Sequence, residues 1–421
     1  AKSLVERGLA YPCFCTEEEL DKVRAKQEED KVLTGYYGEY AACRNLSYEE
    51  VEANIKAGKP YVLRLRSQGN PDKEITFVDA IKGEIKLPEN IHDIVLLKKD
   101  GIPTYHFAHA IDDHLMRTTT VVRGGEWLAS APIHYELFHL LGFKMPAYAH
   151  TAHLMKFDEE TGGKRKLSKR KDPELSLDYY RKDGYHPYTM KVYLLTLLNS
   201  NFEEWHEKFP DKDINEFPFS VEKMNQSGAL FDKDKLHNIC KNELSKLSEE
   251  ELYDFLYDWA KENEPENVEK WFGNREKMLQ ILRLYMGVGA KRRRKDLMYA
   301  KQIFELISYF FDGESAEEMD EFKLDEDMVS KILKSYLAKY DHNDDNSVWF
   351  NKLKEIADEH GFASDMKAYK ANPENFKGNV SDIAEAVRIA VTGRANTPDL
   401  WTIVHIMGEE QMTERIKKHI K

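Results

Sequence analysis

The first hundred residues alternate between short apolar runs and strongly charged segments, which predicts strands mixed with helices. Residues 9–15 form an apolar run typical of a short strand. Thr16, with Glu19 three residues later, has the spacing of a capping box and predicts the start of a charged helix. Residues 61–66 alternate between apolar and polar positions, and residues 75–98 contain further runs typical of strands.

The next stretch has the pattern of a strand, a turn and a helix. An apolar strand ends at Arg123, two glycines and Glu126 follow, and an amphipathic helix runs over about 131–141. Residues 148–157 predict another strand. Sites in such sheets lie at the carboxyl ends of strands. Arg123 and Glu126, at the end of the first of these two strands, are therefore candidate site residues.

After residue 172 the pattern becomes mostly helical. Segments 175–182, 188–198 and 220–224 predict short helices, and amphipathic helices continue from about Ser248 to the end. Residues 381–392 predict a helix that Gly393 closes, and few strand signals occur in this part. The chain is therefore expected to be α/β in its first part and all-α in its last part.

Composition indicates an ordered cytoplasmic protein. The 421 residues are 33% charged and 41% hydrophobic, with a formal net charge of −13. No apolar run approaches the ~18 residues of a membrane span. There is no signal peptide and there are 4 cysteines, which favours a reducing cytoplasm. The negative net charge argues weakly against nucleic-acid binding, but local basic surface matters more than the total.

One basic stretch, residues 164–171, does not fit a simple solvated run. It contains six cations around Leu167 and Ser168 and follows a turn with two glycines. A solvated run has no need of an apolar anchor, and a hydroxyl between Lys166 and Lys169 lets two ammonium groups and a donor converge on phosphates. Phosphoryl chemistry needs positive charge at the transition state, and a hinged loop can deliver it. The alternative is a nucleic-acid patch or a solvated run.

Residues 166–170, Lys-Leu-Ser-Lys-Arg, resemble the KMSKS loop of class I aminoacyl-tRNA synthetases in the form typical of glutamyl- and glutaminyl-tRNA synthetases. Residues 104–116 and 122–127 are similar to the bacterial glutamyl-tRNA synthetase block around the amino-acid site, although that family usually has Asn, or in some branches His, at the position of His109. Residues 217–236 resemble its stem-contact domain, and residues 390–398 its helical anticodon-binding domain.

This resemblance implies an ATP- and Mg²⁺-dependent ligase that forms glutamyl-adenylate and then esterifies tRNA(Glu), as a cytoplasmic monomer without membrane contact. The lysine loop would stabilise charge on the phosphates, and a tyrosine and an arginine would contact glutamate. The residues that the resemblance assigns are Lys169 and Lys166 for catalysis; Lys166, Leu167, Ser168, Lys169, Arg170 and Glu126 for ATP; Tyr105, His109 and Arg123 for glutamate; and Arg388 and Arg394 for tRNA.

Metal binding has two candidate groups. Cys13, Cys15 and Cys43 are similar to the structural Zn²⁺ site of some family members, where a further Cys, His or Tyr completes the tetrahedron, but buried thiols are an equal alternative. The histidines between 106 and 114 match no ligand spacing, and residues 112–114 are interpreted as a hydrogen-bonded turn.

The expected domains are an acceptor-binding insertion (1–98), the second half of a Rossmann-like catalytic domain (99–160), the lysine loop with a stem-contact domain (161–246) and a helical anticodon-binding domain (247–421). Neither a His-x-Gly-His-like motif nor the family's early glutamate-binding arginine occurs. We therefore expect this chain to lack the first half of the nucleotide fold, and to bind tRNA without forming adenylate.

Three alternatives remain at this point. A glutaminyl-tRNA synthetase shares the lysine loop, but its anticodon domains are β-barrels rather than helices. The tRNA-modifying glutamyl-queuosine relative has no anticodon domain. A tRNA-binding module without catalysis is the alternative from a different class. The sequence does not decide whether glutamine tRNA is also charged.

Overall fold

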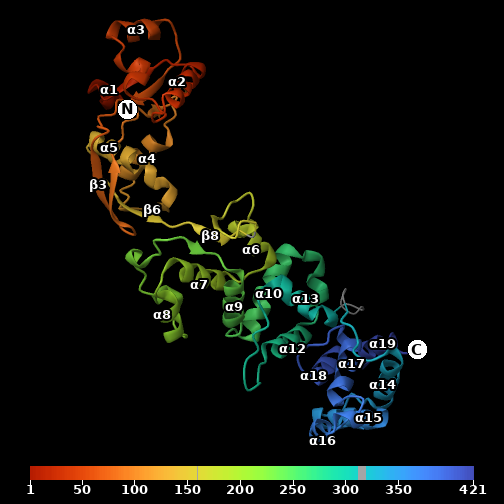
Figure 1. The fold of residues 1–421 in the computed structure, drawn as a ribbon. Helices are drawn as coiled ribbons and strands as arrows, with labels where there is room; N and C mark the ends of the chain where they lie inside the picture. Colours follow the sequence, from red (N-terminus) through yellow and green to blue (C-terminus); the bar gives the residue numbers. More distant parts are fainter. Residues whose placement is uncertain (159, 312–318) are drawn as a thin grey trace. The chain divides into compact units, whose positions relative to one another are not determined.

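The computed structural model describes residues 1–158, 160–311 and 319–421 and divides into two compact units (Figure 1). Unit 1 comprises residues 1–167 and 195–231, and unit 2 comprises residues 168–194 and 232–421. Helix α7 (Pro187–Leu198) begins in unit 2 and ends in unit 1. The chain therefore passes between the units after residues 167, 194 and 231.

The described part of unit 1 contains three small sheets. One is antiparallel with the order β1-β2-β5, one is mixed with the order β4-β3-β7-β6, and one has the order β10-β8-β9. In the mixed sheet β6 and β7 are parallel along their whole length, as expected for a strand–helix–strand unit. The strands, sheet by sheet, are β1 (Ala10–Cys13), β2 (Val62–Leu65) and β5 (Val95–Leu97); β4 (Gly83–Pro88), β3 (Glu74–Asp79), β7 (Ala147–Thr151) and β6 (Thr120–Gly124); and β10 (Ala229–Leu230), β8 (Leu154–Phe157) and β9 (Lys164–Lys166).

Helix α2 of unit 1 begins directly after Thr16, as the sequence predicts. The capping boxes at Thr16 and Ser47 are both formed, each with its reciprocal pair of hydrogen bonds. The α-helices are α1 (Lys2–Glu6), α2 (Glu17–Glu29), α3 (Tyr48–Lys56), α4 (Tyr105–Leu115), α5 (Ala131–Leu141) and α8 (Phe202–Lys208), and the 3₁₀ turns are η1 (Gly38–Tyr40), η2 (Ala42–Asn45), η3 (Gly125–Ser130), η5 (Ile214–Glu216) and η6 (Val221–Lys223).

One apolar cluster joins the first sheet of unit 1 to helices α4 and α5. Leu65 and Leu96 come from the sheet, Phe107 from α4, and Leu137 and Phe138 from α5, and all are buried. Because α4 and α5 also pack against each other, the end of β6 is held on a rigid support.

Three sequence predictions in unit 1 need correction. Residues 148–157 do not form one strand, because the chain leaves β7 after Thr151 and starts β8 at Leu154 in another sheet. Residues 112–114 are not a turn but the last turn of α4, which follows the buried stripe of Phe107 and Ala110. Residues 220–224 form only the single 3₁₀ turn η6.

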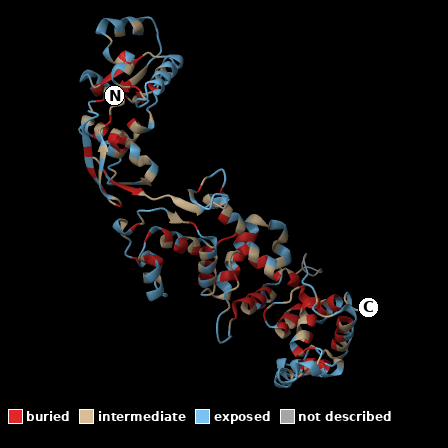
Figure 2. Ribbon diagram, viewed as in Figure 1, coloured by how far each residue is buried: buried red, intermediate tan, exposed pale blue. Residues whose placement is uncertain are grey.

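Unit 2 is helical throughout its described residues, without a named strand. Most of its buried apolar side chains belong to one cluster that runs from Leu244 to Ile416, and Figure 2 shows many buried positions along these helices. Its α-helices, besides the first part of α7, are α6 (Leu177–Asp183), α9 (Lys233–Leu244), α10 (Glu249–Asn263), α11 (Val268–Phe272), α12 (Arg275–Met286), α13 (Ala300–Ile307), α14 (Glu326–Lys339), α15 (Asn346–His360), α16 (Met366–Ala371), α17 (Val380–Thr392), α18 (Leu400–Met407) and α19 (Glu409–Lys417), and its 3₁₀ turns are η4 (Pro173–Leu175), η7 (Pro265–Asn267), η8 (Ser308–Phe310) and η9 (Pro373–Asn375).

Among the described residues, no helix combines the length and the apolar character that crossing a bilayer requires.

Candidate active site

Arg123, near the carboxyl end of β6, is the centre of a polar cluster in unit 1. Its Nε donates to His150 Nε2 at 2.9 Å, its Nη1 lies 3.1 Å from His134 Nδ1, and its Nη2 donates to the Trp127 carbonyl at 3.3 Å. Its guanidinium carbon also lies 4.6 Å from the centre of the Tyr148 ring. The guanidinium is therefore fixed in direction by β7, η3 and α5 together.

Behind Arg123 lies a wholly buried pair, Asp79 and His150. His150 Nδ1 is 2.6 Å from Asp79 Oδ2, and both side chains are 0% exposed. The Asp79 carboxylate also accepts backbone N–H groups from Ile81 and Lys82. Burial opposes its ionisation, but these hydrogen bonds and the one from His150 outweigh burial and hold the pKa of Asp79 below its usual value.

His134 of α5 lies on the other side of Arg123. Its ring is 0% exposed, and its Nε2 is 3.0 Å from His106 Nδ1. Burial lowers the pKa of His134 to about 2, and the neighbouring His109 and Arg123 charges act in the same direction. His134 is therefore neutral at all physiological pH values and can accept a hydrogen bond from Arg123.

Tyr105 and His109, on the first two turns of α4, form an aromatic wall of the same cluster. Tyr105 is 49% exposed, its ring centre lies 4.5 Å from that of Trp127, and it is stacked on His109. His109 Nε2 is 2.8 Å from the Tyr148 hydroxyl, and Asp113 lies 2.9 Å from its Nδ1. The structure thus brings Tyr105, His109 and Arg123 together.

Glu126 and Lys166 form a second group at the same edge of unit 1. Lys166 Nζ and His153 Nδ1 lie 3.6 and 3.4 Å from the Glu126 carboxylate. Its own backbone amide, and then the charges of Lys166 and His153, hold the pKa of Glu126 below its usual value. A Cβ at position 124 would meet the Glu126 carboxylate, so a larger residue there would displace this flexible, half-exposed side chain.

The basic stretch is partly a hairpin and partly a tight turn. In unit 1, β9 pairs antiparallel with β8, and Leu167 is buried at 3% exposure with its N–H bonded to the Leu154 carbonyl. Leu167 is thus the apolar anchor that the sequence indicates. In unit 2, Asp172 accepts the Ser168 N–H at 2.8 Å and fixes the start of the turn, while Lys169 and Arg170 are exposed.

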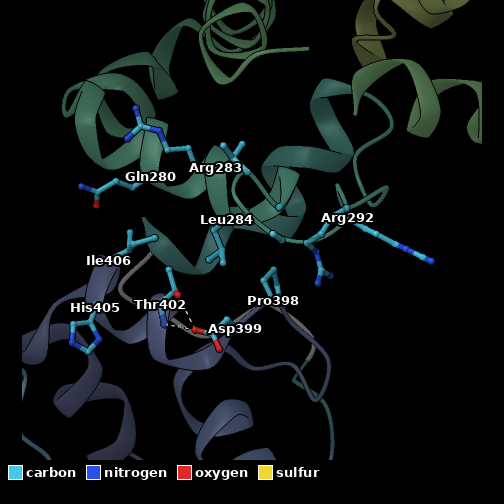
Figure 3. Close-up of a pocket in the computed structure, with 13 residues that line it drawn as sticks. Gln280, Arg283, Leu284, Arg292, Pro398, Asp399, Thr402, His405 and Ile406 are labelled. Carbon is cyan, nitrogen blue, oxygen red and sulfur yellow. Dashed lines mark hydrogen bonds between the residues drawn. The ribbon is translucent and has the colours of Figure 1, made fainter. Parts of the chain in front are cut away.

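Arg388 and Arg394 lie at the end of α17 and just after it in unit 2. Both are half-buried, and they donate to the carbonyls of Ala395 and Glu305. Unit 2 also has a cleft of about 670 Å³ between α12 and α18, with Leu284 and Pro398 facing the same gap in Figure 3. The residues that line this cleft include three arginines, Arg283, Arg292 and Arg294.

The three N-terminal cysteines of the sequence gather in one cluster. Cys15 Sγ and Cys43 Sγ are 3.6 Å apart, and the three sulfurs lie within 4.8 Å of one another. The Tyr36 hydroxyl is 3.4 Å from Cys13 Sγ and 3.3 Å from Cys15 Sγ. Hydrogen bonds from the other two thiols hold the pKa of Cys13 well below its usual range. In tetrahedral Zn²⁺ sites, sulfurs are separated by about 3.8 Å, so this donor set fits such an ion.

Sequence reasoning missed Asp79, His134, Tyr148 and His150 as site residues. A signal existed for two of them. His134 stands on the apolar stripe of α5, three and four residues before Leu137 and Phe138, and Asp79 takes a buried position in the alternation of β3. A polar residue at a buried position needs a partner, but the sequence does not say which one.

Comparison with known proteins agrees with this arrangement. Residues 1–238 match the family model of the catalytic domain of class I tRNA synthetases (E and Q), and residues 265–420 match that of an anticodon-binding domain. The glutamate–tRNA ligase of Acetivibrio thermocellus is 53% identical over 99% of this chain and 76% of its own length, and that of Clostridium perfringens strain SM101 is 47% identical over 100% and 76%. A crystal structure of the glutamate tRNA ligase from Elizabethkingia meningosepticum, in complex with its amino acid, has a TM-score of 0.74 at 25% identity, covering 99% of this chain and 80% of that one.

These matches assign the fold to the class I aminoacyl-tRNA synthetases. Within that class, the chain belongs to the family of glutamate–tRNA ligases. The helical unit 2 agrees with this family rather than with the glutaminyl alternative, whose anticodon domains are β-barrels.

Proposed function

We propose that this chain acts in the ATP-dependent attachment of glutamate to tRNA(Glu). The observation that carries the proposal is the Arg123 cluster, together with Glu126 and Lys166 at the same edge of unit 1. A guanidinium has five N–H donors, and Arg123 uses three of them on His150, His134 and Trp127. Among the described residues, two donors remain, one on each Nη, and such a pair suits a carboxylate.

Glutamate would lie against Arg123 with Tyr105 and His109 as its wall. Tyr105 is half-exposed, stacked on His109 and in tilted contact with Trp127, so it offers a rigid face and a hydroxyl to a small polar ligand. A substrate carboxylate held by the guanidinium would place the glutamate near the edge where Glu126 and Lys166 lie. The geometry supports recognition of a small acidic amino acid.

ATP, as its magnesium salt, would supply the phosphate that the glutamate carboxylate attacks. Lys166 and Lys169 would neutralise the charge that develops on the phosphates, and Leu167, Ser168 and Arg170 would hold the loop on the nucleotide. Leu167 is buried and Asp172 fixes the Ser168 amide, so the loop is attached at both of these points. Glu126 would lie beside ATP.

The partner tRNA would contact the helical unit. We place its contacts at the arginine-lined cleft between α12 and α18 and, in part, at Arg388 and Arg394. Arginine contacts to phosphates make such binding fall with added salt. The four domains expected from the sequence remain part of this proposal, as does a monomeric, cytoplasmic protein.

We also propose a structural Zn²⁺ held by Cys13, Cys15 and Cys43, with Tyr36 next to it. The sulfur separations support the proposal, and the Phe14 N–H donates to Cys43 Sγ at 3.4 Å, as it would to a thiolate. A structural metal would fix the loop of residues 36–43 onto β1.

Lys169→Ala tests the proposed role of the loop. In the product of the complete reading frame, with tRNA(Glu) and glutamate present, we expect ATP–pyrophosphate exchange to fall about 10²–10³-fold, since one charge that stabilises a transition state is lost. Glutamate binding should change far less. Lys182→Ala, an exposed lysine of α6, is the control. Exchange that is unchanged in Lys169→Ala would refute the role of the loop.

A further inference from the structure

The hydrogen-bond partners of Arg123 determine the tautomers of the histidines around it. Arginine has donors but no acceptor, so a ring nitrogen that contacts it must carry a lone pair. His150 Nε2, at 2.9 Å from Arg123 Nε, is therefore an acceptor. His134 Nδ1, at 3.1 Å from Arg123 Nη1, is an acceptor for the same reason.

This requirement fixes the proton of His150 on its other nitrogen. A neutral imidazole with its lone pair on Nε2 carries its hydrogen on Nδ1. That nitrogen lies 2.6 Å from Asp79 Oδ2, so it donates to Asp79, which must be a carboxylate. Asp79, His150 and Arg123 thus form a chain in which each member determines the hydrogen position of the next.

Asp79 is suited to this task because every contact it makes is with a donor. Backbone N–H groups of Ile81, Lys82 and His150 reach it at 2.9–3.1 Å, besides the His150 ring. An ionised carboxylate has only acceptors and satisfies all of these contacts. An amide at the same place would present its NH₂ group to a donor in either of its two orientations.

We propose that Asp79 and His150 are positioning residues that hold the Arg123 guanidinium so that its two remaining N–H groups meet the carboxylate of the amino-acid substrate. This inference rests on the proposed function of Arg123. Neither residue reaches the substrate, since both side chains are 0% exposed. They keep His150 in the tautomer that accepts from Arg123, and they keep the Arg123 guanidinium in the direction that bidentate recognition of a carboxylate requires.

Three variants of the complete enzyme test the proposal in steady-state aminoacylation. Asp79→Asn should raise the KM for glutamate about 10–100-fold, because a guanidinium shifted by an ångström loses that much. His150→Phe removes the ring nitrogen that accepts from Arg123 Nε, and it should raise the KM for glutamate by a similar factor. His150→Gln offers its Oε1 near the place of Nε2, so we expect a rise only a few-fold above the wild type. The KM values for ATP and tRNA should stay within twofold in all three.

Glu136→Gln is the matched control, because it removes a half-buried carboxylate that also accepts several hydrogen bonds. Glu136 lies on α5 in the same unit and accepts hydrogen bonds from Asn90, Ser67 and Gln68. It should lower the melting temperature as Asp79→Asn does, but leave the KM for glutamate unchanged. The proposal is wrong if Glu136→Gln raises this KM equally, or if the KM values for glutamate and ATP rise together in Asp79→Asn.

Arg123→Lys separates this inference from the function on which it rests. If Arg123→Lys leaves the KM for glutamate unchanged, the proposed glutamate site itself is wrong. If Arg123→Lys raises it while Asp79→Asn and His150→Phe do not, only the positioning role fails. Nitrogen-15 NMR of the His150 ring adds a direct readout: we expect an Nδ1–H tautomer in the wild type and its loss in Asp79→Asn.

Discussion

Unit 1 and unit 2 differ in what they bury. Around the mixed sheet and the first sheet, unit 1 buries titratable side chains that bond to one another, among them Asp79, Asp93, His134 and His150. Most of the core of unit 2 is one apolar cluster over its helices. Buried polar groups that bond to one another fix each other's direction, and removing one of them leaves its partner unpaired, which costs much stability. Apolar cores instead tolerate substitutions that conserve volume. The difference places the networks of buried polar groups in unit 1 and the large apolar core in unit 2.

Residues 1–98 contain a second network of buried polar groups, comparable to the Arg123 cluster. Asp93 is wholly buried and bonds to the Tyr11 hydroxyl at 2.6 Å and to the Arg44 guanidinium, and the Arg64 guanidinium lies over the Tyr36 ring at 4.0 Å. The Tyr36 hydroxyl in turn contacts the Cys13 and Cys15 sulfurs. Unit 1 therefore has networks of buried polar groups at two separate places.

Removal of the proposed zinc should have the largest effect, and it should affect unit 1 but not unit 2. Elemental analysis of protein purified in metal-free buffer should find about one zinc per chain, and chelation should unfold the insertion while unit 2 stays helical. Structural zinc contributes on the order of 10 kcal/mol to small domains. Circular dichroism and limited proteolysis over residues 1–98 would follow the loss.

Cysteine variants supply the matched comparison for this experiment. Cys43→Ser should abolish zinc binding, because it removes one of three clustered sulfurs. Cys240→Ala removes the buried thiol of unit 2, which bonds only weakly to Thr189 at 3.5 Å, and should leave the zinc content unchanged. Finding no zinc in the wild type would favour buried thiols instead.

The sequence predicts unit 2 more completely than unit 1, and the reason is local. Helix α10 begins at the capping box of Ser248 and Glu251, and α17 ends at Gly393 with φ of 74°, as the pattern indicates. Both signals lie within one or two helical turns. An apolar stripe along a helix can pack against any apolar surface. Its burial can therefore be predicted from the helical repeat of apolar positions alone.

The site of unit 1 needs contacts that no local pattern carries. Asp79 and His150 are 71 positions apart, and Arg123 meets His150 from 27 positions away. The resemblance to a known family supplied Arg123, Tyr105 and Lys166, but not the buried pair behind the arginine. Residues 112–114 were misjudged because the acidic pair and the histidine are typical of a turn, whereas tertiary packing of Phe107 and Ala110 favours a helix there.

A core truncation in unit 2 should separate stability from recognition. Ile332 of α14 is 0% exposed, and Ile332→Ala should lower the free energy of unfolding by about 2–5 kcal/mol. We expect the KM for glutamate to stay unchanged, in contrast to Asp79→Asn. Urea unfolding checks the first statement and steady-state kinetics the second. Val348→Ala, at a position 43% exposed, should change stability by less than about 0.5 kcal/mol.

The smallest predicted effect concerns the pH dependence of unit 1. Burial lowers the pKa of His134 to about 2 in the folded protein, against 6.5 for the ordinary side chain. Between these pH values the unfolded chain binds a proton at His134 that the folded protein does not bind. Stability is therefore intact above pH 6.5 and falls as the pH decreases below it, by up to ~1.4 kcal/mol per pH unit. At pH 5 this amounts to roughly 2 kcal/mol.

His134→Asn isolates this contribution, because an amide oxygen can accept from Arg123 Nη1 but cannot titrate. Other histidines of unit 1 with a lowered pKa, such as His106 and His150, keep their own share of the slope. We therefore expect the pH dependence of unfolding in His134→Asn to fall short of the wild type by a fraction of a proton at pH 7, rising to about one proton at pH 5. The readout is the slope, so a constant loss of stability from the substitution does not obscure it. His139→Asn, at an exposed position of the same helix, should keep the wild-type slope. An unaltered slope in His134→Asn would mean that His134 is protonated inside the fold, which the donor Arg123 at 3.1 Å opposes.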